Sequence, residues 1–139
     1  MPDNKPIMPI PAAHQQLIFA SEMNYAPVLS IAIPTYQRFD LLKETLASVF
    51  ALEFAIPVEV LIVDNDPNQP ELALAEMTKF DEYNFSYYKN HDNLGMFGNW
   101  NQCLNLAKGK YITLLHDDDV LLPEFAQQMN RLLKQGSLD

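Results

Sequence analysis

Two short apolar runs of nearly the same character place the strongest constraint on the fold of this chain. Residues 28–33 read VLSIAI and residues 58–63 read VEVLIV, and each run stops at a proline or a turn-rich segment. Strands that are almost continuously apolar are typical of parallel sheets with both faces covered. Between the runs, apolar residues recur from Leu41 to Phe50 at the spacing of one buried helical stripe, and Asp40 is placed to cap that helix.

The rest of the chain continues this alternation of strand and helix. We expect a helix over 70–79, a weaker strand over 85–89 at a sheet edge, a loop over 90–98, a helix over 96–107 ended by Gly109, a central strand over 111–115, and a last helix from Pro123 to about Lys134. The order β-α-β-α-β-α-β-α predicts an α/β fold: a Rossmann-like, mostly parallel sheet with helices on both faces. Such sheets bind ligands outside the carboxyl ends of their strands.

The chain is predicted to hold one domain, residues 28–139, preceded by an appendage over residues 1–27. Prolines up to Pro11 disfavour regular structure there, whereas residues 12–23 suit a short helix. The 139 residues are 48% hydrophobic, which is enough apolar material for one real core.

The composition argues against several classes of function. A net charge of −9 disfavours broad binding to nucleic acid or to an anionic membrane. It leaves room for a nucleotide held through a metal ion, because the metal carries the positive charge. Cys103 is the single cysteine, so no internal disulfide forms, and no apolar run approaches the roughly 20 residues of a transmembrane helix. We therefore expect a cytoplasmic protein, free or peripheral at the inner face of a membrane.

Three consecutive carboxylates, Asp117 to Asp119, follow the strand over 111–115. Adjacent carboxylates repel one another, and a divalent cation removes that repulsion because hard cations prefer anionic oxygen ligands. The alternative is a solvated acidic turn. Residues 34–36, 64–65 and 90–98 are expected at the same rim of the sheet, and this convergence favours a binding site.

Three segments in this order and spacing resemble the N-terminal, donor-binding half of a family 2 glycosyltransferase with the GT-A fold: SIAIPTYQR (30–38), EVLIVDN (59–65) and GKYITLLHDDD (109–119). The resemblance covers about residues 28–135. It implies transfer of a sugar from a nucleotide-diphosphate donor to a hydroxyl acceptor, with inversion at the anomeric carbon. A bound Mn²⁺ or Mg²⁺ would neutralise the departing nucleoside diphosphate. The acceptor stays open among a glycan, a lipid-linked glycan and a protein.

The resemblance also implies where the nucleotide binds. Pro34, Thr35 and Tyr36 follow the first strand, where the family meets the base, and Tyr36 offers a flat face for stacking. Asn65 stands where similar proteins often carry a second aspartate that accepts the uracil N–H. An asparagine still accepts through its carbonyl oxygen, but uridine, thymidine and guanosine all remain open. Asp64 either helps to bind the base or ribose, or caps the turn.

Residues 93–99 resemble the family's loop that leads into the helix before the metal motif, and the resemblance implies that this loop faces the donor diphosphate. Gly95 and Gly98 would let the backbone approach the donor at a helix N-terminus, whereas Phe97 and Trp100 are expected in the core.

The acidic turn aligns with the family's Asp-x-Asp signature, with His116 in the place of its first aspartate. We predict Asp118 and Asp119 at the metal, with Asp118 as the ligand and Asp119 as support. Asp117 is predicted at the nucleotide, as a ribose or metal partner. A literal Asp117-x-Asp119 pair and His116 as a ligand are the alternatives.

Two functions remain open from the sequence. One is a metal-dependent glycosyltransferase. The other is a non-catalytic, truncated fragment that binds a nucleotide sugar and metal but lacks the acceptor half. No residue is predicted as the general base that deprotonates the acceptor. Such a fragment would expose apolar surface and so self-associate.

Overall fold

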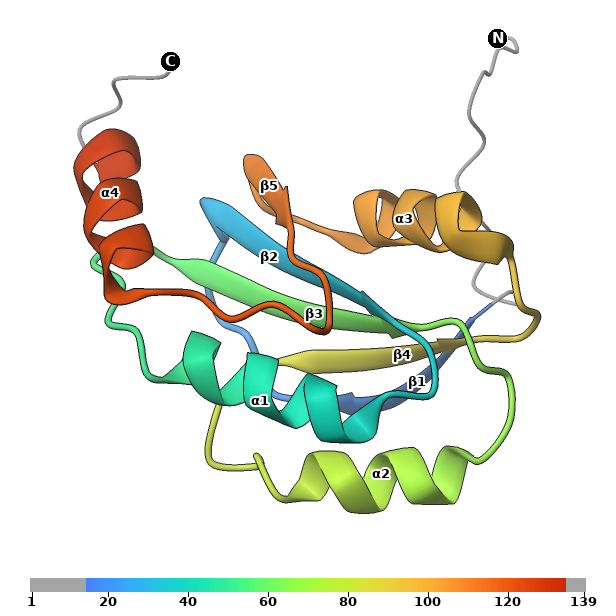
Figure 1. Ribbon diagram of the computed structural model, residues 1–139. Helices are drawn as coiled ribbons and strands as arrows, with labels where there is room; N and C mark the ends of the chain where they lie inside the picture. The colour runs from blue at the N-terminus through green and yellow to red at the C-terminus, as the bar shows by residue number, and fades with distance from the viewer. Residues whose placement is uncertain (1–14, 135–139) are drawn as a thin grey trace, which may run out of the picture.

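The two apolar runs form neighbouring parallel strands inside a five-stranded sheet (Figure 1). The computed structural model describes residues 15–134, in which the strand order is β1-β4-β3-β2-β5. Strand β2 spans Leu29–Thr35 and β3 spans Val58–Asp64, with Thr35 opposite Asp64. Strands β4 (Ser86–Asn90) and β5 (Tyr111–Leu114) extend the parallel sheet on either side. The predicted α/β fold with a mostly parallel sheet is therefore confirmed.

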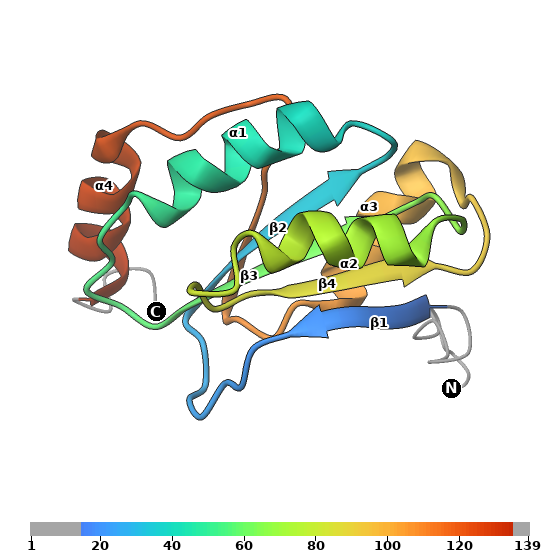
Figure 2. The same cartoon turned by 90° about the horizontal axis from the view of Figure 1, so that it is seen from below.

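Helices cover both faces of the sheet, as Figures 1 and 2 show. Helices α1 (Phe39–Phe50) and α2 (Pro70–Thr78) pack on one face, and α3 (Gly95–Leu106) packs on the other. Helix α4 (Pro123–Lys134) adds Leu133 to the core of the α1 face. Alternate residues of the central strands serve the two layers: Ile31 and Ile33 face α1, while Ala32 packs with Cys103 of α3. This alternation explains why both runs are apolar at nearly every position.

The segment before β2 contradicts its predicted helix. Gln15–Ala20 forms strand β1, which pairs antiparallel with β4, and the predicted helical residues 12–14 lie outside the described part of the chain. The register shifts between Leu17 and Phe19, so the apolar residues of β1 do not alternate as in a regular strand. Phe19 stacks on Phe85 with ring centroids 4.7 Å apart. Pairing with β4 and this ring contact override the local helical pattern.

Three further expectations are corrected by the structure. Strand β4, predicted at an edge, lies between β1 and β3, because its polar Lys89 and Asn90 find buried hydrogen-bond partners. Strand β5, predicted to be central, is an outer strand of the described sheet and leaves Ile112 39% exposed. Helix α1 begins at Phe39 without a side-chain cap, and Asp40 lies in its first turn, where a carboxylate still favours the helix dipole.

Gly109 lies beyond the end of α3 at Leu106, where the chain turns into β5. A Cβ atom there would lie 2.6 Å from Ser30 Oγ and 2.7 Å from Ser30 N. Only glycine permits this close approach, which brings β5 alongside β2 and so positions the acidic turn.

Candidate functional site

A cavity of about 290 Å³ lies at the carboxyl ends of β2, β3 and β5. Its lining comes from the segments that follow these strands and from the start of α3: Pro34, Thr35, Tyr36, Arg38, Asn65, Asn93, Met96, Asn99, Trp100, His116 and Asp117. Five of the predicted site residues are thus brought together: Pro34, Thr35, Tyr36, Asn65 and Asp117. Asp64, Gly95, Asp118 and Asp119 are not part of this lining.

Asp117 is the buried carboxylate of the cavity wall. Its side chain accepts a hydrogen bond from Thr35 Oγ1 at 2.7 Å, across 82 residues of sequence. Thr45 of α1 donates to the backbone carbonyls of Asp117, at 2.9 Å, and of Asp119, at 2.5 Å. The side chain of Asp119 is exposed, so it is the backbone of this residue that the fold uses. Strand β2 and helix α1 therefore hold the acidic turn in place.

Arg38 supplies a cation that the sequence prediction missed. Its Nη1 atom lies 3.6 Å from Asp117 Oδ1 and 3.5 Å from Asp118 Oδ2. Its side chain is half exposed, so the guanidinium reaches the two carboxylates from the solvent side of the cavity. The structure brings Asp117 and Asp118 together around one positive charge, which partly offsets the repulsion within the acidic turn.

The described residues form no group of three or more histidine, cysteine, aspartate or glutamate side chains that could enclose a metal ion. Mg²⁺ at phosphate-transfer sites is usually held by one or two carboxylates together with phosphate oxygens and water. Asp117 and Asp118 match that incomplete donor set. The pair therefore fits a metal that arrives with a diphosphate, rather than one held by protein alone.

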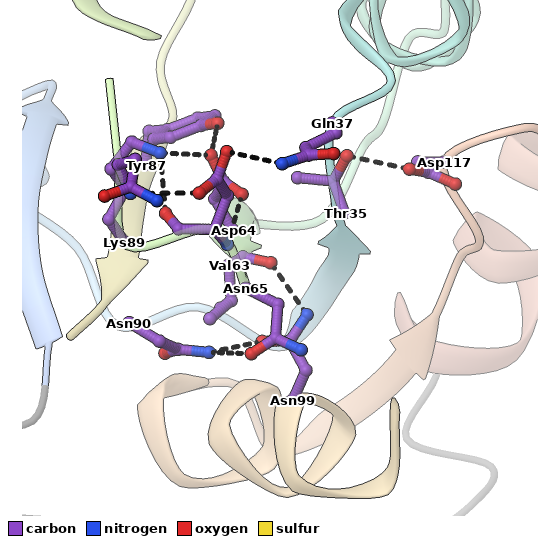
Figure 3. Close-up of polar contacts among 12 residues, drawn as sticks. Thr35, Gln37, Val63, Asp64, Asn65, Tyr87, Lys89, Asn90, Asn99 and Asp117 are labelled. Atoms are coloured by element: carbon purple, nitrogen blue, oxygen red, sulfur yellow. Dashed lines mark hydrogen bonds and ion pairs between the residues drawn. The ribbon is translucent and has the colours of Figure 1, made fainter. Parts of the chain in front are cut away.

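Asp64 caps the turn after β3, and its side chain lies beside Tyr87 and Lys89 (Figure 3), outside the cavity lining. Its Oδ1 accepts the Asp66 N–H at 2.9 Å, while its Oδ2 accepts from Lys89 Nζ at 2.9 Å and Tyr87 Oη at 2.5 Å. The side chains of Asp64 and Lys89 are each only 3% exposed. Burial raises the pKa of Tyr87 far above its ordinary value, and the nearby Asp64 carboxylate raises it further. Of the two sequence alternatives for Asp64, these contacts favour the turn cap.

Asn65 lines the cavity with the donors and the acceptor of its side-chain amide already engaged by protein. Its amide nitrogen donates to Asn93 Oδ1 at 2.8 Å and to the Gly95 carbonyl at 3.2 Å. Its Oδ1 accepts from Asn90 Nδ2 at 3.0 Å and from the Leu94 N–H at 2.9 Å. An amide oxygen has two lone pairs, so these contacts leave no acceptor for a nucleotide base and argue against the predicted role of Asn65.

The aromatic residues of the loop differ from expectation. Phe97, predicted in the core, is 67% exposed, and Trp100 is half-buried in the cavity wall, where its ring meets His116 edge-to-face at 5.6 Å. Gly95 has φ of 77°, and a Cβ on it would meet no atom within 4 Å. The positive φ alone favours glycine at this position, and the approach to a donor predicted for it stays a prediction. The signal that could have revealed this wall is the recurrence of asparagine at positions 90, 93 and 99.

None of the described helices combines the length and the apolar character needed to cross a membrane.

The family model for glycosyl transferase family 2 matches residues 30–139. A GalNAc(5)-diNAcBac-PP-undecaprenol beta-1,3-glucosyltransferase of Campylobacter jejuni is 30% identical over 97 residues, which are 69% of this chain and 31% of that protein. S. aureus TarS 1-349, solved with UDP-GlcNAc, superposes with a TM-score of 0.63 at 21% identity, covering 78% of this chain and 31% of that one.

A mannosyltransferase from Pyrobaculum calidifontis, solved with GDP-Man and Mn²⁺, gives a TM-score of 0.62 at 20% identity and covers 79% of this chain and 33% of that one. The present chain spans about a third of the length of the curated relatives it matches. With its matching family model and the fold described above, the chain belongs to glycosyl transferase family 2.

Proposed function

We propose that this chain forms the donor-binding part of an inverting glycosyltransferase, which transfers a sugar from a nucleotide-diphosphate donor to a hydroxyl acceptor with Mn²⁺ or Mg²⁺ bound. The observation that carries the proposal is the rim cavity, in which the segments after β2, β3 and β5 meet around Asp117. The structural neighbours solved with UDP-GlcNAc and with GDP-Man and Mn²⁺ support a nucleotide-sugar ligand. These two neighbours bind nucleotides with different bases, so the experiments below compare several nucleotides.

Within this cavity, the base is proposed to stack on Tyr36, which lines the cavity and is 42% exposed. Pro34 and Thr35 contribute backbone, because the Thr35 hydroxyl is already donated to Asp117. Gly95 turns the backbone at the start of α3, whose N-terminus favours the diphosphate. Asp64 is proposed to support the site indirectly, because it caps the turn that follows β3.

Asp117 and Asp118 are the residues proposed to hold the metal. Asp117 is also proposed as a ribose partner, and Asp119 is proposed to support their turn. A bound divalent ion supplies neutralisation of the charge that develops on the departing nucleoside diphosphate. Arg38 stands beside the same two carboxylates and can add a second positive charge. These groups bind and orient the donor, and none of them is proposed as the base for the acceptor.

The second candidate is a binding fragment that holds the donor without transferring the sugar. Apolar side chains at and after the outer strand β5 favour it, because Ile112, Val120 and Leu122 are 39%, 56% and 64% exposed. Such a surface is suited to packing against further protein or to self-association. Acceptor-dependent release of nucleoside diphosphate from a donor would decide for the enzyme.

Asp118→Asn is expected to weaken metal-dependent nucleotide binding by at least about tenfold, or ~1.4 kcal/mol. The reason is that the variant removes one of the two carboxylates proposed to hold the metal. Calorimetric titration of UDP, TDP and GDP, with and without Mn²⁺, measures the effect. The exposed Asp81→Asn is the matched control and is expected to bind like the unmodified protein. Equal affinities for all three proteins in Mn²⁺ would mean that the metal site is misassigned.

Tyr36→Ala is expected to weaken UDP, TDP and GDP by similar factors, because stacking of about 1–3 kcal/mol does not depend on which base is bound. Tyr36→Phe keeps the ring and is expected to retain the affinity. The same titration series in Mn²⁺ checks both variants. If Tyr36→Ala weakens the binding of only one of the three nucleotides, Tyr36 instead forms a hydrogen bond with the edge of that base.

A further inference from the structure

A chain of amide side chains runs from the outer strand β1 to the wall of the cavity. Gln102 of α3 donates through Nε2 to Gln15 Oε1 on β1, at 2.9 Å, and to Asn90 Oδ1 on β4, at 3.1 Å. Asn90 donates in turn to Asn65 Oδ1 at 3.0 Å, and Asn65 donates to Asn93 Oδ1 at 2.8 Å. Asn65 and Asn93 line the cavity. This series of hydrogen-bonded amides, the amide chain, therefore links an outer strand of the sheet to the candidate nucleotide site.

Backbone N–H groups determine which amide is the donor and which is the acceptor in each hydrogen bond of the amide chain. The Leu94 N–H donates to Asn65 Oδ1, and the Gly95 N–H donates to Asn93 Oδ1, each at 2.9 Å. Because a backbone N–H can only donate, the oxygen and nitrogen of these two amides cannot be exchanged. Because the Leu94 N–H identifies the accepting atom of Asn65 as Oδ1, the Asn90 atom that lies 3.0 Å from it must be the donor Nδ2.

A second branch fixes the same direction independently (Figure 3). Asn99 donates to the Val63 carbonyl at 3.0 Å, so its oxygen is left to accept from Asn90 Nδ2 at 2.9 Å. With both hydrogens of Asn90 donated, its Oδ1 must accept, and Gln102 Nε2 is the group that donates to it. The direction is therefore determined from the cavity outward as far as Gln102.

Gln102 provides this donor, but its own amide oxygen is left without a hydrogen-bond partner in the part of the chain that the structure describes. It is fully buried, and its Oε1 is the buried side-chain polar atom without a hydrogen-bond partner among the described residues. A buried, unpaired acceptor destabilises a fold, and an apolar side chain would avoid it. The two donor bonds of Nε2 are what an apolar side chain could not provide.

We propose that Gln102 and Gln15 are positioning residues for the nucleotide site. They hold Asn90, and through Asn65 they hold residues 93–95, which turn into the cavity wall. The proposal rests on the proposed function for the identity of the ligand. Gln15 lies outside residues 30–139, the range matched by the family model, so β1 becomes a working part of the site in this chain.

The test uses the full chain with Gln102→Leu, which removes both donor bonds together with the unpaired oxygen. Amide hydrogen exchange of Leu94 and Gly95 is expected to quicken by at least about fivefold, beyond any change at Ile62 of β3, because these two N–H groups lose ordered acceptors. UDP, TDP and GDP, titrated in Mn²⁺, are expected to bind at least about fivefold more weakly. Gln128→Leu, on the exposed surface of α4, is the matched control and should change neither quantity.

A second pair of variants separates positioning from folding and leaves the core untouched. Gln15→Glu keeps an acceptor for Gln102 Nε2 and is expected to match the unmodified protein. Gln15→Leu removes the acceptor and is expected to shift exchange and affinity in the same direction as Gln102→Leu. This pair carries the test if Gln102→Leu does not fold.

Unchanged exchange at Leu94 and Gly95 in the folded leucine variants would overturn the proposal, as would a rise no larger than that at Ile62. If the unmodified protein binds none of the nucleotides, the proposed function fails, while the exchange measurement still decides whether the amide chain orders this loop. Faster exchange with unchanged nucleotide affinity would also overturn the positioning role.

Discussion

Lys89→Met is expected to lower the free energy of unfolding by about 3–5 kcal/mol, the usual cost of removing one partner of a buried ion pair. Lys89 Nζ donates to Asp64 Oδ2 at 2.9 Å and to the Asp66 carbonyl at 2.7 Å, and both charged side chains are almost completely buried. Methionine fills a similar volume but leaves the Asp64 charge with the Tyr87 hydroxyl as its side-chain partner. Urea denaturation at neutral pH measures the loss.

Lys79→Met is the matched control, because Lys79 pairs with Glu76 at 3.3 Å with a side chain that is 57% exposed. Exposed pairs contribute roughly 0–1 kcal/mol, so this variant should unfold close to the unmodified protein. A similarly small loss in Lys89→Met would show that the Asp64 carboxylate is not held as a buried charge.

Local patterns predicted the elements that carry most of the core. The runs that became β2 and β3, and the acidic turn after β5, could be placed on one rim because parallel strands share a direction. The order of strands across the sheet could not be predicted, since the burial of Lys89 depends on a partner in another strand. Strand β1 was missed because the register shift after Leu17 removes the alternation that identifies a strand.

Side-chain positions in the site were predictable where the direction of the strands decides them. Tyr36 and Asp117 line the cavity as expected, since a ring after a strand and a carboxylate in a turn each carry their own signal. Arg38 was missed because its contacts exist only after Thr45 fixes the turn at Asp117. For Asn65, the sequence indicates its hydrogen-bonding capacity but not that other asparagines and the backbone use it up.

Asn65→Asp is expected to destabilise the protein by about 2–4 kcal/mol at neutral pH, because position 65 is only 5% exposed and a buried polar group left unpaired costs about 1–3 kcal/mol, and more when it is charged. Asparagine donates two hydrogen bonds here, to Asn93 Oδ1 and to the Gly95 carbonyl. An aspartate has no hydrogens to donate and would set a charged oxygen against both acceptors. Thermal or urea unfolding measures the loss, with the exposed Asn101→Asp as the matched control.

Acid conditions should partly restore the variant. Burial and the two facing oxygens raise the pKa of the new carboxyl in the folded state, and its protonated form can donate one of the two lost hydrogen bonds. Because the folded pKa lies above the unfolded value, the stabilising protonation is present at low pH and is lost as pH rises through the folded pKa. The gap to the unmodified protein should therefore widen from acid to neutral pH.

The same variant separates the two roles considered for Asn65. If the residue reads the base, the aspartate keeps the fold and changes the ranking of UDP, TDP and GDP, because an anionic acceptor favours a ring N–H donor. If the residue holds residues 93–95, stability falls and all three nucleotides weaken together. The hydrogen bonds of Asn65 favour the second result. If Asn65→Asp keeps its stability but changes the order of preference among UDP, TDP and GDP, Asn65 contacts the nucleotide base after all.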